Sequence, residues 1–216
     1  MNPSAKDAVC EVLDSGYIGQ GPKVDEFEKQ IGDYFGNKKV ITTNAGTSAL
    51  HLALHLLKKP KPHWNEDVFQ GVAFVSHNWP GIEDGDEVLA TPLTCTASNW
   101  PIVANNLKIK WVDIDPTTLN MDLEDLERKM TPKTKAIMGV HWGGYPLDLD
   151  EIRNIRARFR KEHGWAPALI EDGAHSIGTK YKGKYLGNHG NFVMNSLQAI
   201  KHITSVDGGL LYCPHD

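Results

Sequence analysis

Residues 195–211 read NSLQAIKHITSVDGGLL and contain one lysine, Lys201, among small, hydroxyl-bearing and glycine residues. The apolar run that follows the two glycines, Leu210 to Tyr212, is typical of a short strand. A lone lysine of this kind is most often a solvent-exposed loop residue. It can also be a Schiff-base lysine, which must lose its proton before the amine attacks an aldehyde. A second segment, farther upstream, favours the Schiff-base interpretation.

That segment, residues 168–178, reads ALIEDGAHSIG and has the pattern of a buried strand that ends in carboxylates. In open α/β sheets, ligands bind beyond the carboxyl ends of the strands. A pyridine cofactor that carries an aldehyde needs an amine to hold the aldehyde and a carboxylate to keep the ring nitrogen protonated. Asp172 and Lys201 are candidates for these two groups. The alternative for Asp172 is a helix N-cap directly after the strand.

The composition is that of a soluble globular protein. The chain has 216 residues, 40% apolar and 23% charged, which suits one large domain or two small ones. A net charge of −4 and the lack of a basic stripe with aromatic residues give no indication of nucleic-acid binding. No apolar run is long enough to span a bilayer, and the N-terminus does not resemble a secretory signal. The cysteines, Cys10, Cys95 and Cys213, form neither a disulfide framework nor a metal motif, so we expect a cytoplasmic protein.

The N-terminal segment 1–36 is predicted to be helical. Residues 4–15 have helical spacing, a glycine-rich loop follows at 17–22, and Pro22 opens a second helix. The apolar residues that can share one face of the first helix are Ala5, Ala8, Val9, Val12 and Leu13.

A strand at 39–43 then leads through a turn of small residues into a helix predicted over 49–58. Free N–H groups and the helix dipole at such a start make an anion site, to which Thr47 and Ser48 can add hydroxyl donors. The alternative is ordinary N-capping by Thr47 or Ser48.

The rest of the chain alternates strands and helices. Residues 60–80, with several prolines and tryptophans, are predicted to form a surface excursion. The strands expected after it are 87–91, 108–113 and 135–140, with a further buried strand that ends at the apolar residues 168–170. The helices are 99–106, 123–130 and 149–163. This alternation predicts an α/β fold with a mostly parallel, doubly wound sheet.

Six motifs in this order closely resemble the DegT/DnrJ/EryC1/StrS aminotransferases. They are GTSALHLAL (46–54), GDEVLATP (85–92), VDIDPTTLNMDLEDLE (112–127), VHWGGYPLDLDEI (140–152), EDGAHSIG (171–178) and SLQAIKHIT (196–204) with DGG (207–209). The family comprises pyridoxal-phosphate enzymes of the type I, aspartate-aminotransferase-like fold, many of which act on nucleotide-linked keto sugars. The resemblance implies that residues 1–216 form the large, cofactor-binding domain. It also implies that the family's small C-terminal domain is missing, as in a fragment, a split gene or a truncated homologue.

The resemblance assigns roles to individual residues. Lys201 falls on the Schiff-base lysine, where a related branch of dehydratases has histidine, so the aminotransferase branch is favoured. Asp172 falls on the carboxylate that pairs with the pyridine nitrogen. His175 falls beside the ring hydroxyl, and its alternative is a core histidine. The predicted phosphate cradle consists of Gly46, Thr47 and Ser196, with Ser48 as a further hydroxyl donor.

One position departs from the family pattern. The family usually places an aromatic residue after the EVLATP strand to stack on the pyridine ring, and Cys95 stands there in this chain. A thiol can pack on a ring but offers less area than an aromatic side chain. Trp100 could compensate, or it could be a core tryptophan.

The expected reaction is transfer of an amino group from an amino acid, glutamate by resemblance, to a nucleotide-linked keto sugar. We expect a homodimer in which the 16–22 loop lies near the partner's site. Because the family closes its site with the C-terminal domain, the 216-residue chain is expected to bind the cofactor and to be a poor catalyst.

Three alternatives remain open from the sequence. The first is a weak or inactive truncated paralogue that serves as a cofactor-binding or scaffold subunit, and the second is a pyridoxal-phosphate-dependent sugar dehydratase. The third is a metal hydrolase, although no pair of its candidate ligands has the spacing of a metal motif. Those candidate ligands are His141, Asp172, His175, His189 and His202.

Overall fold

The computed structural model describes residues 4–58 and 79–214, and the predicted excursion at 60–80 lies outside them except for its last two residues. Within these ranges a seven-stranded sheet runs in the order β1-β9-β8-β5-β4-β2-β3. Its strands are β1 (Val40–Thr43), β2 (Glu87–Ala90), β3 (Lys108–Trp111), β4 (Thr134–Val140), β5 (Ala168–Asp172), β8 (Phe192–Ser196) and β9 (Gly209–Tyr212). A separate small ribbon pairs β6 (Lys180–Tyr181) with β7 (Lys184–Tyr185).

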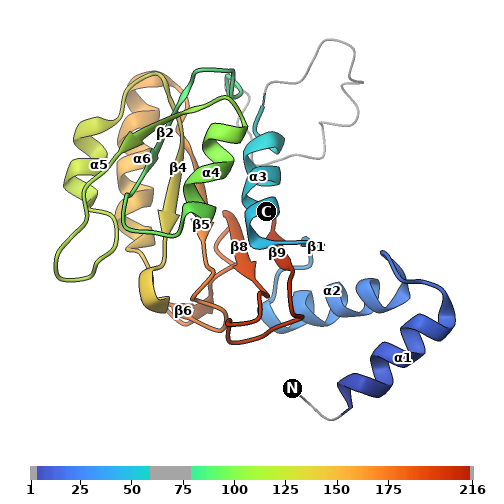
Figure 1. The fold of residues 1–216 in the computed structure, drawn as a ribbon. Coiled ribbons are helices and arrows are strands. Elements are labelled where there is room, and N and C mark those ends of the chain that lie inside the picture. The colour runs from blue at the N-terminus through green and yellow to red at the C-terminus, as the bar shows by residue number, and fades with distance from the viewer. Residues whose placement is uncertain (1–3, 59–78, 215–216) are drawn as a thin grey trace.

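The sheet is mostly parallel, as predicted. Strand β2 pairs in parallel with β3 and β4, β4 with β5, and β5 with β8. Strand β9 is antiparallel to both of its neighbours, β8 and β1. Strand β1 therefore runs in the same direction as the parallel strands, and the loops that follow β1, β2, β4, β5 and β8 meet at one edge of the sheet (Figure 1). Ligands bind at this edge in open α/β sheets.

Helices cover both faces of the sheet because its strands are apolar on both sides. Helices α3 (Gly46–Leu56) and α4 (Thr96–Ala104) pack on the face that carries Ile170. Helices α5 (Leu123–Lys129) and α6 (Leu149–His163) pack on the other face, against Leu169. Helix α2 (Pro22–Phe35) covers that second face at the β1 end, where Phe35 meets Val193. Neighbouring residues of a strand thus face different helices, as the pleat of a strand requires.

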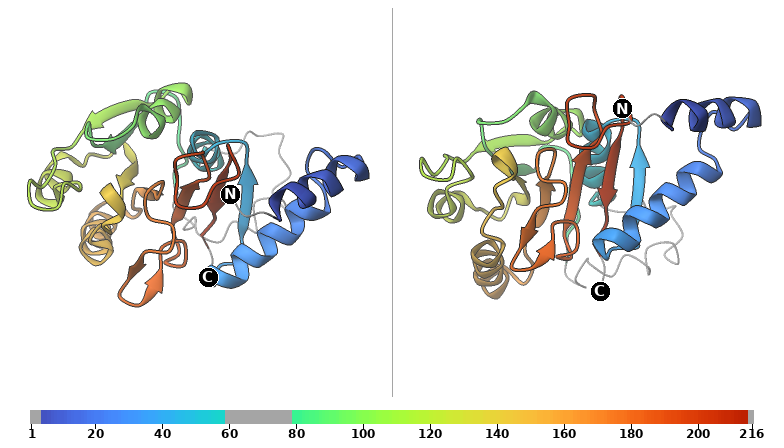
Figure 2. Two further views of the ribbon diagram at one scale, coloured as in Figure 1. Left: turned by 60° about the horizontal axis from the view of Figure 1, so that its bottom comes forward. Right: turned by 90° about the horizontal axis from the view of Figure 1, so that it is seen from below.

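Helix α1 (Ala5–Ser15) projects away from this body, beyond α2 (Figures 1 and 2). The helix is found where the sequence predicts it, and it ends at Gly16, whose φ of 76° is left-handed. Its apolar face, however, covers no core: no α1 residue is buried, and Val9 and Leu13 are 57% and 62% exposed. The amphipathic pattern predicts a helix but not the partner of its apolar face.

Two helices begin three residues earlier than predicted. Helix α3 starts at Gly46 instead of Ala49, and α4 starts at Thr96 instead of Asn99. Proline favours the first turn of a helix, so Pro101 agrees with the predicted start at Asn99. In the structure, α4 starts at Thr96 and Pro101 lies inside the helix. In the described part of the chain, no helix combines the length and the apolar character that crossing a membrane requires.

Candidate active site

The carboxyl edge of the sheet brings the first turn of α3 against the end of β8. Gly209, at the start of β9, lies opposite both Thr43 and Ser196. A Cβ added at Gly46 would lie 2.8 Å from Met194 Sδ and 3.3 Å from Ser196 Cβ. Glycine therefore allows the helix start to approach Ser196 closely.

The start of α3 presents N–H groups that suit an anion. Ala45 precedes the helix in an extended conformation, and no side-chain hydrogen bond caps it. The N–H groups of Gly46 and Thr47 belong to the first turn, where a helix has no acceptor of its own. These groups and the helix dipole fit a phosphate, beside the hydroxyls of Ser48 and Ser196. The N-cap interpretation of Thr47 or Ser48 is wrong, since both lie inside the helix.

Asp172 is the last residue of β5 and is only 5% exposed. Its Oδ1 accepts a hydrogen bond from the Ala174 N–H at 2.9 Å, and its Oδ2 accepts one from Ser98 Oγ at 2.6 Å. Each carboxylate oxygen keeps a second lone pair. Asp172 can therefore accept a further bond from a protonated ring nitrogen, as a pyridine cofactor requires.

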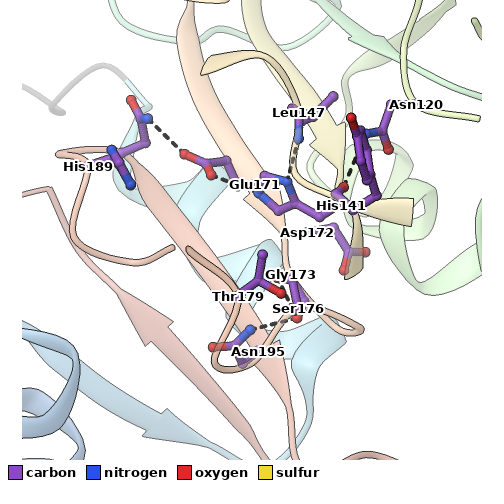
Figure 3. Close-up of polar contacts among 12 residues, drawn as sticks. Asn120, His141, Leu147, Glu171, Asp172, Gly173, Ser176, Thr179, His189 and Asn195 are labelled. Carbon is purple, nitrogen blue, oxygen red and sulfur yellow. Dashed lines mark hydrogen bonds and ion pairs between the residues drawn. The ribbon is translucent and has the colours of Figure 1, made fainter. Parts of the chain in front are cut away.

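The chain turns sharply after Asp172. The Gly173 N–H donates to Met194 O at 2.8 Å, and the next residues form a turn, not a helix. The N-cap interpretation of Asp172 is therefore wrong. A Cβ at Gly173 would lie 2.7 Å from both Asn195 Nδ2 and Met194 O, so this turn requires glycine. Asn195 also donates to Gly173 O at 2.6 Å (Figure 3).

His175 lies in the same turn and is half-buried, so it is not a core histidine. Burial, and then the positive charge of Lys201, lower the pKa of His175 below its ordinary value of 6.5, while Asp172 opposes this shift. His175 is therefore neutral at pH 7. Asp172 precedes this turn, and Lys201 lies in the loop that follows β8, the strand that pairs with β5. The Trp142 ring packs edge-on at 6.0 Å between centroids.

Lys201 lies in the loop that joins β8 to β9 and is half-buried. Two backbone hydrogen bonds close this loop: the Leu197 N–H donates to Gly208 O at 2.9 Å, and the Ser205 N–H donates to Leu197 O at 3.0 Å. The loop is thus tied at its base. Its lysine lies beyond the carboxyl end of β8, the strand that pairs with β5.

The position at which the resemblance places ring stacking holds no aromatic side chain. Cys95 is exposed and is the residue before the first turn of α4. Trp100 is 62% exposed, so its interpretation as a core tryptophan is wrong. It lines a surface groove together with Thr47 and Ser48 at the start of α3.

A fully buried pair, His141 and Glu171, lies beneath the site and was missed by the sequence analysis. His141 Nε2 and Glu171 Oε2 are 2.8 Å apart, and the Leu147 N–H donates to His141 Nδ1 at 3.0 Å (Figure 3). Because Nδ1 accepts a bond, the ring proton belongs on Nε2, which donates to the carboxylate. The other oxygen, Oε1, accepts from Asn191 Nδ2 at 2.7 Å. The sequence contained a sign of this pair. Adjacent side chains of a strand point to opposite faces of the sheet, so Glu171 must face away from Asp172.

This pair also bears on the metal hypothesis. Both ring nitrogens of His141 are engaged, so this residue has no lone pair free for a metal ion. Across residues 4–58 and 79–214, no three His, Cys, Asp or Glu side chains form a group that could hold one.

The model of the DegT/DnrJ/EryC1/StrS aminotransferase family matches residues 1–63 and 71–216. The chain belongs to this family. The type I, mostly parallel α/β fold predicted from the motifs is thereby confirmed, and the family's solved structures share it.

Among them, AtS13 from Actinomadura melliaura is 50% identical, with a TM-score of 0.86 over 99% of this chain and 52% of AtS13. The sugar aminotransferase CalS13 from Micromonospora echinospora is 42% identical, with a TM-score of 0.86 over 100% of this chain and 53% of CalS13. The spore coat polysaccharide biosynthesis protein SpsC of Bacillus subtilis is 35% identical over 203 residues, which are 94% of this chain and 45% of SpsC. The 216-residue chain thus spans about half the length of the relatives that it matches.

The comparisons also agree with the predicted cofactor. Spr1654 from Streptococcus pneumoniae, solved in its pyridoxal-phosphate form, is 27% identical, with a TM-score of 0.83 over 100% of this chain and 52% of Spr1654. The residues of this chain fit the same group: a helix start for the phosphate, a buried carboxylate for the ring nitrogen and a lysine in the loop that follows β8.

Proposed function

We propose that this chain is the cofactor-binding part of a pyridoxal-phosphate-dependent aminotransferase. The enzyme transfers an amino group from an amino acid, glutamate by family resemblance, to a nucleotide-linked keto sugar. The observation that carries the proposal is the arrangement at the carboxyl edge of the sheet. The buried Asp172 ends β5, Lys201 lies in the loop after the neighbouring strand β8, and α3 presents its N-terminus at the same edge. A scaffold subunit would need neither the lysine nor the buried carboxylate.

When bound, pyridoxal phosphate supplies an electron-withdrawing ring that stabilises negative charge on the substrate carbon. Lys201 would hold the aldehyde, and its amine, when free, would take up and return a proton. Asp172 would keep the proton on the ring nitrogen, since an ion pair favours the charged form of both partners. His175, being neutral, can share a hydrogen bond with the ring hydroxyl. Gly46 and Thr47 would bind the phosphate through their N–H groups.

The relatives support a sugar as the acceptor, because CalS13 is a sugar aminotransferase and SpsC is a polysaccharide biosynthesis protein. A lysine at position 201 favours amination over the dehydratase branch. The unburied apolar face of α1 and the exposed Tyr17 and Ile18 support a homodimer that covers this N-terminal segment. The cysteines Cys10, Cys95 and Cys213 are free, which agrees with a cytoplasmic enzyme.

The proposal is tested by trapping the cofactor on the protein. Borohydride reduction of the loaded protein, followed by peptide mapping, should place the label on Lys201, whereas Lys201→Ala should stay unlabelled. Lys184→Ala, on the β6–β7 ribbon, is the matched control and should label like wild type. Mass spectrometry of a mixture with glutamate and a nucleotide-linked keto sugar then checks for the aminated sugar. Label on a different lysine, or none, would contradict the assignment.

A further inference from the structure

Thr94 and Ser98 lie outside the predicted site and yet are linked directly to it. Ser98, in the first turns of α4, is 1% exposed, and its Oγ lies 2.6 Å from Asp172 Oδ2. Thr94, in the loop before α4, has its Oγ1 2.6 Å from Ser98 Oγ. A serine inside a helix commonly bonds a backbone carbonyl of the preceding turn. Here the hydroxyl reaches a carboxylate on a different element.

The direction of both hydrogen bonds follows from the chemistry of the groups. An ionised carboxylate only accepts hydrogen bonds, so Ser98 must donate to Asp172. A hydroxyl has a single proton, which leaves Ser98 as the acceptor of the bond from Thr94. The chain of donors therefore runs from Thr94 through Ser98 to Asp172. Consecutive bonds of this kind polarise and strengthen one another.

We propose that Ser98, supported by Thr94, is a positioning residue that orients Asp172 toward the ring nitrogen of the cofactor. The inference rests on the proposed function and adds to it a donor chain from α4. The Ala174 N–H holds Oδ1 and Ser98 holds Oδ2, so two donors from different elements define the plane of the carboxylate. Without Ser98, the carboxylate can rotate, and its buried oxygen loses a donor.

The same helix also connects two parts of the site. Cys95, at the ring-stacking position, is the residue before the first turn of α4, and Ser98 follows three residues later. Helix α4 therefore carries both the residue expected at the ring face and the donor to Asp172. A displacement of α4 would move both contacts together.

The test compares Ser98→Ala and Thr94→Val with Thr131→Val. Thr131 also donates to a carboxylate, Glu87 Oε2 at 2.9 Å, but at the start of β2 and away from the site, which makes it the matched control. The readouts are the Kd for pyridoxal phosphate and the pH midpoint of the visible absorbance change of the bound cofactor. A merely structural role would not move the midpoint.

We expect Ser98→Ala to weaken cofactor binding about tenfold and to shift the midpoint, since a bond to a charged group is lost. Thr94→Val should act in the same direction with a smaller effect, and Thr94→Ser, which keeps the hydroxyl, should restore both values. Thr131→Val should change neither.

Three results would overturn the inference. The first is a folded Ser98→Ala with the wild-type Kd and midpoint. If Ser98→Ala does not fold, Thr94→Val provides the test. The second contradicting result is then a Thr94→Val protein with the wild-type Kd and pH midpoint. The third is an equal loss of affinity in Thr131→Val, which would indicate general destabilisation. Failure of the wild-type protein to bind pyridoxal phosphate would instead reject the proposed function, and this inference with it.

Discussion

Replacing Asp172 by asparagine tests the electronic role of the carboxylate with little change of shape. The amide oxygen can still accept the Ala174 N–H bond, which is 2.9 Å long in the native protein. The amide nitrogen that replaces Oδ2 lies beside Ser98 Oγ, and this hydroxyl can turn to accept its bond. We therefore expect the apoprotein to keep its fold, with a free energy of unfolding within about 1 kcal/mol of wild type.

Cofactor binding should suffer much more. A hydrogen bond to a charged group contributes about 1.5–3 kcal/mol, which corresponds to roughly a 10- to 100-fold loss of affinity for pyridoxal phosphate. Asp172 is only 5% exposed, so water cannot take over the interaction that the carboxylate makes with the ring nitrogen. Because the ring nitrogen also loses the partner that keeps it protonated, the half-reaction with glutamate should slow by on the order of 10²-fold or more.

Absorbance titration gives the Kd, stopped-flow spectroscopy gives the rate of the half-reaction, and chemical denaturation checks the fold. The matched control is Asp122→Asn at the N-cap of α5, where asparagine caps about as well as aspartate. This control should leave cofactor affinity and rate unchanged. A folded Asp172→Asn protein with near-native affinity and rate would refute the role assigned to the carboxylate.

The other predictions concern the turn after β5 and the buried thiol. Gly173→Ala should lower the free energy of unfolding by about 1–3 kcal/mol in chemical denaturation, because the new Cβ would lie 2.7 Å from Met194 O. Since burial lowers the pKa of His175 from 6.5, the unfolded chain binds this proton more readily than the folded one, so stability should fall as the pH falls below 6.5. His175→Gln should flatten that part of the stability profile, and an unchanged slope would contradict the assignment. Burial raises the pKa of the Cys213 thiol, so iodoacetamide should alkylate the two exposed cysteines first and Cys213 only after unfolding, as peptide mapping would show.

Local patterns predicted most of the elements. The charged segment 149–163 predicts helix α6 with its observed limits, and the structure shows clear signals at both ends. Asp148 caps the first turn through the Asp150 and Glu151 N–H groups, and Gly164 ends the helix in a left-handed conformation. The start of α3 lacks such a signal, since Ala45 caps it without a side-chain bond, and its prediction was three residues late. A helix start without a characteristic capping residue cannot be located from the local sequence pattern.

The candidate site divides in the same way. Asp172 and Lys201 could be named because strand order and family motifs place them at the carboxyl edge of a parallel sheet. Ser98 could not, because its bond to Asp172 joins residues 74 positions apart. The pairing of His141 with Glu171 spans 30 positions and likewise depends on which strands become neighbours. Hydrogen bonds across the sheet follow from topology, which no single segment encodes.

The reversed direction of β9 has a consequence for how this site can diversify. A parallel neighbour of β8 would need a long crossover connection, but an antiparallel one is joined by a local loop. Lys201 therefore lies in a hairpin loop whose two ends, Ser196 and Gly209, are paired in the sheet. Insertions or deletions within that hairpin can change the position of the Lys201 amine without changing the order of the strands in the sheet. The carboxylate of Asp172, at the end of β5, would keep its position, so such changes would move the lysine relative to a fixed carboxylate.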